Sequence, residues 1–367
     1  MVIMSKKETQ ISSMFSDFKP NGSSFKLLLL TLMVLQNSSV VLIGRYTRDS
    51  QAKEDVYVVN HLILVCECMK FVFACLLEFK MTNGQLYKSF KENVFDTPLD
   101  ALKIIIPSLL YLFQNTLLYV ALSNLSAPLF QVTYQSKLLT TAVVSVIMLQ
   151  RKYSPKQWVC LTTLGFGVAF VVLGATESKP GEDDESESGQ SLFTGLVAVS
   201  CACFSSALAG VYFEKVLKKP TSDGAQTKAP VSLWMRNIQM AFFSVCIACF
   251  NNYGNIGIDA VDQAKEFCHG FTTWVWVLAL LQAGGGLLVA AVIKYADNVL
   301  KGLATGVSVV TSTACSMVLF GTPLTTQFGI GAIIILCSVF FFSNDIPGGK
   351  AKVGAVEEKK SLASNLV

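Results

Sequence analysis

The sequence from Phe130 to Lys137, Phe-Gln-Val-Thr-Tyr-Gln-Ser-Lys, places a lysine inside an apolar segment, 127–149, that is long enough to cross a bilayer. A charge at bilayer depth is rare, because it costs roughly 2.5–3.5 kcal/mol even on insertion scales. Where such residues occur, they commonly face a water-filled cavity or a ligand. Lys137 is therefore the first candidate for a residue that does chemistry.

Helical spacing places further polar or aromatic side chains on the face that carries Lys137. Phe130 and Tyr134 precede it by two turns and one turn, and a threonine, Thr141, follows it by one turn. A polar stripe with one lysine on an apolar helix is typical of a cavity wall. Hydroxyl groups alone more often hold membrane helices together, so the interpretation depends on the lysine.

A second lysine, Lys301, lies near the start of another apolar segment, 299–320. Both lysines are followed, two, four and six residues on, by a leucine, a threonine and a valine. Neither segment contains a carboxylate that could neutralise its lysine. Two such lysines that converge near the midplane predict a site for a dianion. The alternative for Lys301 is that its side chain reaches from a helix end to the interface.

Aromatic and amide side chains on other apolar segments point to a nucleotide as that dianion. Tyr111 and Asn115 are one turn apart in the segment 101–123, and Asn237 lies near the start of the segment 231–253. An aromatic ring can stack on a base, and an amide can form hydrogen bonds with it. Small residues at 205–210 would let a backbone or a ligand approach closely.

Two further charged pairs are candidates for either a gate or a structural ion pair. Glu67 and Lys70 are three residues apart in an apolar segment, so they lie on one helix face. Lys294 and Asp297 have the same spacing. The sequence leaves both alternatives open for these four residues.

Composition defines the class of protein. The chain has 367 residues, of which 52% are hydrophobic and only 15% charged, and its mean hydropathy is +0.51. These values indicate an all-α membrane protein with several spans. The 11 cysteines lack metal-ligand spacing, and the acidic run at 182–187 contains no histidine or cysteine. We expect no metal, no cofactor, no nucleic-acid partner and no enzymatic activity.

Hydropathy and polar punctuation predict ten membrane spans. Their approximate ranges are 27–44, 56–79, 101–123, 127–149, 157–174, 191–213, 231–253, 272–293, 299–320 and 325–343. Most of the 29 lysines and arginines fall in the tails and in alternate loops, which predicts that both termini are cytosolic.

An acidic, hydrophilic loop at 175–190 separates five predicted spans from five more. An odd number in each half requires the second half to be inserted upside down, as in many carriers. The predicted organisation is therefore a cytosolic tail at 1–26, a first repeat at 27–174, a luminal loop at 175–190, a second repeat at 191–343 and a cytosolic tail at 344–367.

Four blocks of sequence carry a resemblance to a known family. They are Gln-Val-Thr-Tyr-Gln-Ser-Lys at 131–137, Gly-Val-Tyr-Phe-Glu-Lys at 210–215, Trp-Met-Arg-Asn-Ile-Gln at 234–239 and Lys-Tyr-Ala-Asp-Asn-Val-Leu-Lys-Gly at 294–302. Together they resemble the nucleotide-sugar transporters, in the branch for CMP-sialic acid, UDP-galactose and UDP-N-acetylglucosamine. The similarity runs from about residue 27 to 343.

The resemblance implies the drug/metabolite transporter fold and a multi-pass location in the Golgi membrane, with the endoplasmic reticulum as the alternative. It implies exchange of a cytosolic nucleotide sugar for a luminal nucleoside monophosphate by alternating access. The wording of the blocks favours a UDP-sugar. A CMP-sialic acid transporter and a sugar-phosphate or metabolite exporter of the same fold stay open, as do a homodimer and an association with a glycosyltransferase.

Carried over by position, the resemblance assigns substrate-binding roles to single residues. Lys137 and Lys301 would contact phosphates, Tyr111 and Asn115 would lie near the base, and Ser206, Gly210 and Asn237 would line the cavity. Phe130 stands where many relatives have tyrosine, so one hydroxyl contact to the nucleotide is lost here.

Overall fold

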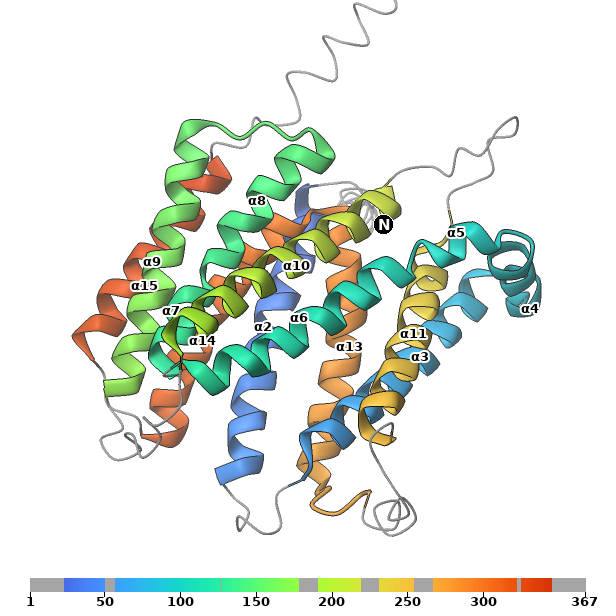
Figure 1. The fold of residues 1–367 in the computed structure, drawn as a ribbon, viewed down its shortest axis with the longest axis horizontal. Helices are drawn as coiled ribbons and strands as arrows, with labels where there is room; N and C mark the ends of the chain where they lie inside the picture. The colour runs from blue at the N-terminus through green and yellow to red at the C-terminus, as the bar shows by residue number, and fades with distance from the viewer. Residues whose placement is uncertain are drawn as a thin grey trace, which may run out of the picture.

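Every element in the described part of the computed structural model is helical (Figure 1). The structure describes residues 23–49, 57–125, 127–177, 191–218, 231–253, 267–321 and 325–344. The principal helices are α2 (Ser23–Asp49), α3 (Val59–Met81), α6 (Ile105–Asn124), α7 (Ala127–Tyr134), α8 (Ser136–Leu149), α9 (Pro155–Glu177), α10 (Leu192–Lys218), α11 (Leu233–Tyr253), α13 (Thr273–Tyr295), α14 (Asn298–Phe320) and α15 (Thr326–Asn344). Three short elements connect α3 to α6: α4 (Leu86–Phe90), the π-helix η1 (Lys91–Phe95) and α5 (Pro98–Leu102).

Eight helical stretches of the described chain are long and apolar enough to cross a membrane. The prediction of an all-helical membrane protein is thus confirmed, whereas the count of ten spans is not reached by length and apolarity. The two remaining predicted spans correspond to α3 and α11. Helix α3 carries Glu67, Lys70 and Glu78, and the apolar stretch of α11 is the shorter Leu233–Cys249.

The fourth predicted span, 127–149, is two helices rather than one. Helix α7 ends at Tyr134 and α8 begins at Ser136, so the break lies at Gln135. The backbone N–H of Gln135 donates to the carbonyl of Val132 at 3.1 Å, and the N–H of Leu138 donates to the carbonyl of Gln135 at 3.2 Å. These bonds span three residues instead of four, so the chain tightens locally just before Lys137.

Helices from the two predicted halves are interleaved (Figure 1). The principal packed pairs are α9 with α15, α6 with α10, α3 with α11, α8 with α10, and α2 with both α13 and α14. Each of these pairs joins a helix of the first predicted half, 27–174, to a helix of the second, 191–343. The halves therefore share one core.

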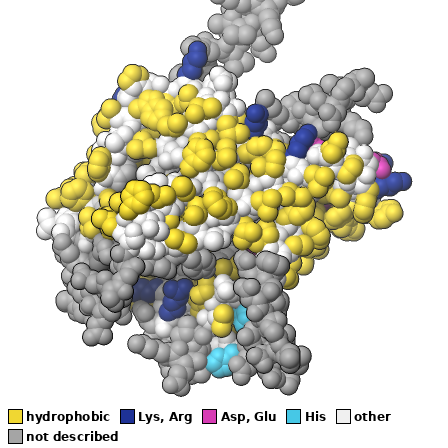
Figure 2. Space-filling view, viewed as in Figure 1, with side chains coloured by type: hydrophobic (Ala, Val, Ile, Leu, Met, Phe, Trp, Pro, Cys, Tyr) yellow, Lys and Arg dark blue, Asp and Glu magenta, His cyan; other side chains and the backbone are white. Residues whose placement is uncertain are grey.

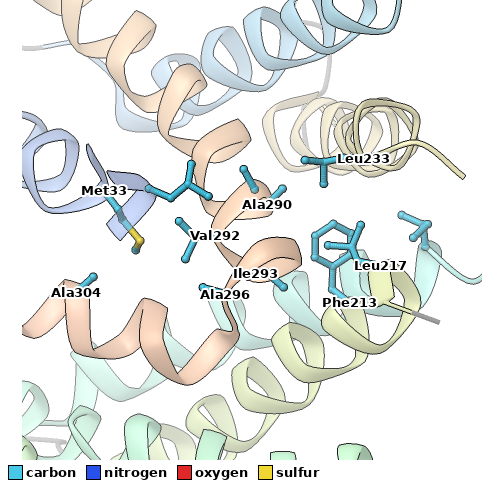
Figure 3. Packing of buried hydrophobic residues seen from close by; sticks show 12 residues of the cluster. Met33, Phe213, Leu217, Leu233, Ala290, Val292, Ile293, Ala296 and Ala304 are labelled. Carbon is cyan, nitrogen blue, oxygen red and sulfur yellow. The ribbon is translucent and has the colours of Figure 1, made fainter. Parts of the chain in front are cut away.

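A buried cluster ties five helices together at one end of the bundle (Figure 3). Phe213 and Leu217 at the end of α10 pack with Leu233 at the start of α11 and Ile293 near the end of α13. Met33 of α2 and Ala304 of α14 belong to the same cluster. This packing places the C-terminal ends of α10 and α13 beside the N-terminal end of α11.

Candidate functional site: a polar pocket and two lysines

A pocket of about 860 Å³ lies between α3, α6, α11 and α13. This volume lies within the range of about 300–1,000 Å³ that is typical of small-molecule sites. Its walls combine apolar and polar side chains from these four helices. The polar ones include Asn60, Glu67, Lys70, Ser108, Tyr111, Asn115, Thr116, Asn237 and Ser244.

Five of the residues predicted from the sequence line this pocket: Glu67, Lys70, Tyr111, Asn115 and Asn237. Tyr111 and Asn115 come from adjacent turns of α6, and Asn237 comes from α11. The side-chain amide of Asn237 donates to the carbonyl of Leu233 at 2.9 Å, which fixes its orientation. An aromatic ring and two amides therefore border one cavity.

The predicted pair of Glu67 and Lys70 lies on the α3 wall of the same pocket. The Lys70 Nζ atom is 2.5 Å from the Glu67 Oε2 atom, and both side chains are largely buried. Lys70 lies against Gly286 of α13, where an added Cβ would be 2.7 Å from the Lys70 Cδ atom. The glycine therefore gives the lysine room to lie flat between the two helices.

Lys137 lies outside the set of pocket-lining residues and joins a polar chain that leads to α6. Its Nζ atom donates to the Tyr134 hydroxyl at 2.9 Å and is 5.1 Å from the centre of that ring. The same hydroxyl accepts from the Gln114 Nε2 atom at 3.4 Å. Phe130 stacks on Tyr134, with ring centres 5.7 Å apart and planes 10° apart. Gln114 thus connects the lysine to the helix that carries Tyr111 and Asn115.

Lys301 lies on α14, which packs against α8, the helix that carries Lys137. A Cβ added at Gly302 would be 2.5 Å from the Leu138 Cδ1 atom, so α8 and α14 meet at the positions that follow the two lysines. The two lysines that the sequence pairs by their matching offsets therefore lie on adjoining helices, and their role in binding phosphates stays a prediction.

Ser206 and Gly210 lie in helix packing rather than on the pocket wall. Ser206 is buried on α10. Gly210 packs against Asn298 of α14, because an added Cβ would be 2.5 Å from the Asn298 Nδ2 atom. In this structure neither residue lines the 860 Å³ pocket, so their substrate-binding role stays a prediction.

Lys294 and Asp297 are not paired with each other. Asp297 caps α14 by accepting from the Leu300 N–H at 2.6 Å, and its other oxygen is 3.0 Å from the Arg151 Nη1 atom. The Lys294 Nζ atom lies 5.6 Å from the centre of the Tyr295 ring. Asp297 therefore pairs with Arg151 rather than with Lys294.

The sequence did not reveal the ion cluster around Glu214, which is completely buried. Glu214 accepts from Arg151, from the Lys218 Nζ atom at 2.7 Å and from the Asn298 N–H at 3.1 Å. Burial alone would lower the pKa of Arg151, but Asp297 and Glu214 hold that pKa above its usual value. A buried carboxylate so close to a helix end was the available signal.

A second cluster joins α5 and η1 to the start of α11. Arg236 donates to the carboxylate of Asp100, and its Nη1 atom donates to the Gln239 Oε1 atom at 3.0 Å. The Gln239 amide in turn donates to the carbonyl of Asn93 at 3.0 Å. We call the end of the bundle that holds Asp100 and Glu214, with their partners, the charged end.

The described ion pairs that connect different elements all lie at the charged end. They are Arg151 with Glu214, Arg151 with Asp297, and Arg236 with Asp100, while the remaining pairs in the described ranges lie three or four residues apart in sequence. The pocket, in contrast, extends to Asn60 and Leu122 near the opposite ends of α3 and α6. Among the described residues, the ion pairs between segments distant in sequence therefore lie at the charged end.

Apolar helices of membrane-spanning length around a polar pocket are typical of membrane carriers. The chain belongs to the nucleotide-sugar transporter family, because the model of that family matches residues 21–343. This membership makes nucleotide-sugar transport its general function.

Two groups of relatives agree with that assignment. The UDP-N-acetylglucosamine transporter of Canis lupus familiaris is 40% identical over 333 residues, which are 88% of this chain and 97% of the relative. The UDP-galactose translocator of Mus musculus is 39% identical over 330 residues, which are 89% of this chain and 80% of the relative. A solved crystal structure with 12% identity and a TM-score of 0.57 covers 87% of this chain and 96% of its own, and shows a similar fold.

Proposed function

We propose that this protein exchanges a UDP-sugar, UDP-galactose or UDP-N-acetylglucosamine, for a nucleoside monophosphate across the Golgi membrane. The observation that carries the proposal is the 860 Å³ pocket with aromatic and amide walls, together with Lys137 and Lys301 on the adjoining helices α8 and α14. The two ammonium groups would bind the phosphates. Tyr111 and Asn115 would hold the base, with Asn237 on the opposite wall.

Gln114 supports a single extended site. It lies on α6 between Tyr111 and Asn115 and donates to the hydroxyl that also accepts from Lys137. The base site and the phosphate site are therefore next to each other along one helix. A ligand with a base at one end and phosphates at the other matches this order.

The charge of the ligands favours exchange over one-way transport. A UDP-sugar carries a charge of about −2, and UMP is close to −2 at neutral pH because its second phosphate pKa is about 6. Either ligand would balance the two lysines. An empty carrier would have to bury both ammonium groups without a counter-ion, at a cost of several kcal/mol. Reorientation of the empty protein would therefore be slow.

The contact pattern supports two inverted repeats of five helices. If α7 and α8 together count as the fourth helix, a two-fold exchange of the halves converts the contact of α6 with α10 into that of α13 with α2. It likewise converts the contact of α8 with α10 into that of α14 with α2. All four contacts are present. This pattern supports the proposal of ten spans, with α3 and α11 as the two less apolar ones, and the distribution of basic residues supports cytosolic termini.

In this orientation the charged end faces the cytosol. Its ion clusters would close the cytosolic entrance, while the pocket extends toward the luminal ends of α3 and α6. Alternating access then requires the clusters around Glu214 and Asp100 to separate when a nucleotide sugar enters. The Glu67–Lys70 pair, on the pocket wall, keeps its two proposed roles as a gate or a structural pair.

The experiment that tests this function is uptake of radiolabelled UDP-sugars into proteoliposomes preloaded with UMP. Lys137→Ala should abolish exchange without loss of folded protein, whereas the control Lys152→Ala, at an exposed lysine of the charged end, should exchange normally. Normal UMP-driven uptake by the Lys137→Ala variant would refute the proposal.

The same assay distinguishes the alternative substrates. A panel of nucleotide sugars, with either UMP or CMP inside the vesicles, separates UDP-galactose and UDP-N-acetylglucosamine from CMP-sialic acid. A sugar-phosphate exporter would lack a base site, so free UMP should not inhibit it. Both named groups of relatives act on UDP-sugars by their names, and we therefore expect UMP to be the effective counter-substrate.

A further inference from the structure

The segment 86–102, between α3 and α6, has an unusual outer surface. Tyr87, Phe95 and Leu99 are 81%, 71% and 72% exposed, and Lys91 between them is exposed as well. These four residues recur at a spacing of four along the short elements α4, η1 and α5. A connection that faced water would not repeatedly expose large apolar side chains.

The inner surface of this segment is fixed to the bundle. The Ser89 hydroxyl donates to the Glu78 Oε1 atom at 2.5 Å, and Asp100 accepts from Arg236. Phe90 and Val94 pack on the buried cluster that contains Met235. The orientation of the segment is therefore set from within, so the exposed stripe is a fixed feature of the surface.

The apolar stripe is continuous with the lipid-facing surface of the neighbouring helices. Leu102 and Ile106, which lead from α5 into α6, are exposed, as are Leu76 and Phe79 at the end of α3. Figure 2 shows hydrophobic side chains across this face, and basic side chains beside them at the right-hand edge, where Figure 1 places α4 and α5. The apolar side chains thus reach the level of the basic ones at the end of the spans.

We propose that the segment 86–102 lies in the membrane interface at the charged end and binds anionic phospholipid. Tyr87, Phe95 and Leu99 enter the boundary between headgroups and acyl chains, as the apolar face of an interfacial helix does. The exposed Lys91 contacts the anionic headgroups, while the Nζ atom of Lys88 lies 4.0 Å from the carboxylate of Glu92. The partner is the lipid surface, because the stripe continues the lipid-facing surface and carries exposed cations beside its aromatic side chains.

Photo-crosslinking of the full chain in vesicles tests the burial of the stripe. The photoreactive residue benzoylphenylalanine replaces Phe95 in protein reconstituted into phosphatidylcholine vesicles that contain phosphatidylserine. Phe166, which is 63% exposed on the span α9, is the lipid-facing control position, and Lys152 is the water-facing one. We expect phospholipid adducts at 95 as at 166. A yield at 95 as low as that at 152 would overturn the proposal.

The headgroup contact is tested with Lys91→Gln in the same protein. One basic residue near an anionic surface contributes about 1 kcal/mol, which corresponds to roughly a five-fold change in local lipid occupancy. The ratio of phosphatidylserine to phosphatidylcholine adducts at 95 should fall by up to this factor, and an unchanged ratio would refute the anionic preference. Adduct formation does not require transport, so its outcome is independent of the proposed exchange.

Discussion

Replacing Glu214 with glutamine removes the charge at the centre of the larger ion cluster. Glu214 is completely buried and accepts from Arg151, Lys218 and the Asn298 N–H. Glutamine keeps the shape of the side chain but can no longer balance the charges of Arg151 and Lys218, whose side chains are 23% and 33% exposed. Each hydrogen bond to a charged group contributes about 1.5–3 kcal/mol, and loss of one partner of a buried ion pair typically costs about 3–5 kcal/mol.

The contacts that remain limit the expected loss of stability to about 3–5 kcal/mol, which is less than the sum over all the lost interactions. Arg151 keeps Asp297 at 3.0 Å, and Lys218 keeps the carbonyl of Ala296 at 2.6 Å. For a chain of 367 residues, about 3–5 kcal/mol corresponds to a decrease in Tm on the order of 5 °C. If the loss falls only on the conformation in which the charged end is closed, ~3 kcal/mol shifts the conformational equilibrium roughly 100-fold.

Thermal unfolding of the purified protein in detergent measures this cost, with Glu92→Gln as the matched control. Glu92 makes an exposed pair with Lys88, whose Nζ atom is 4.0 Å away. Such pairs contribute about 0.3–0.5 kcal/mol, so the control should leave the Tm nearly unchanged. If Glu214→Gln lowers the Tm no more than Glu92→Gln does, the cluster does not hold the charged end together.

Two further predictions concern helix packing and the position of Lys137. Gly331→Ala should destabilise the protein by about 1–3 kcal/mol, because its Cβ would be 2.7 Å from the backbone oxygen of Gly167. The control Gly329→Ala, on the same helix, meets no atom within 4 Å and should be neutral or slightly stabilising. Thermal unfolding measures both variants. Tyr134→Phe removes the hydroxyl that accepts from Lys137, so exchange in proteoliposomes should fall roughly five-fold for one hydrogen bond of ~1 kcal/mol. Equal Tm values for the two alanine variants, or unchanged exchange by Tyr134→Phe, would contradict these geometries.

Local patterns in the sequence were sufficient for the fold class and for part of the site. Apolar segments of spanning length indicate membrane helices whatever their partners are. The one-turn spacing of Tyr111 and Asn115 places both on one face of α6, and both line the pocket.

Contacts between distant residues could not be predicted in the same way. Arg151 and Glu214 are 63 residues apart, and no pattern near either residue names the other. A small residue such as Gly210 suits either a ligand or a neighbouring helix, and no local pattern indicates that Asn298 packs against it. Neither glycine nor proline lies at the break at Gln135, so local propensity does not predict it. We attribute the end of α7 there to tertiary packing.

The break at Gln135 divides the fourth predicted span into two helices that can change their angle to each other. Helix α7 carries Phe130 and Tyr134, and α8 carries Lys137. The 2.9 Å hydrogen bond from Lys137 to Tyr134 therefore crosses the break and stabilises the angle between the two helices. A phosphate that accepts hydrogen bonds from the lysine in place of the Tyr134 hydroxyl would break this contact. Binding at the site and the bend of the helix would then be coupled through one hydrogen bond.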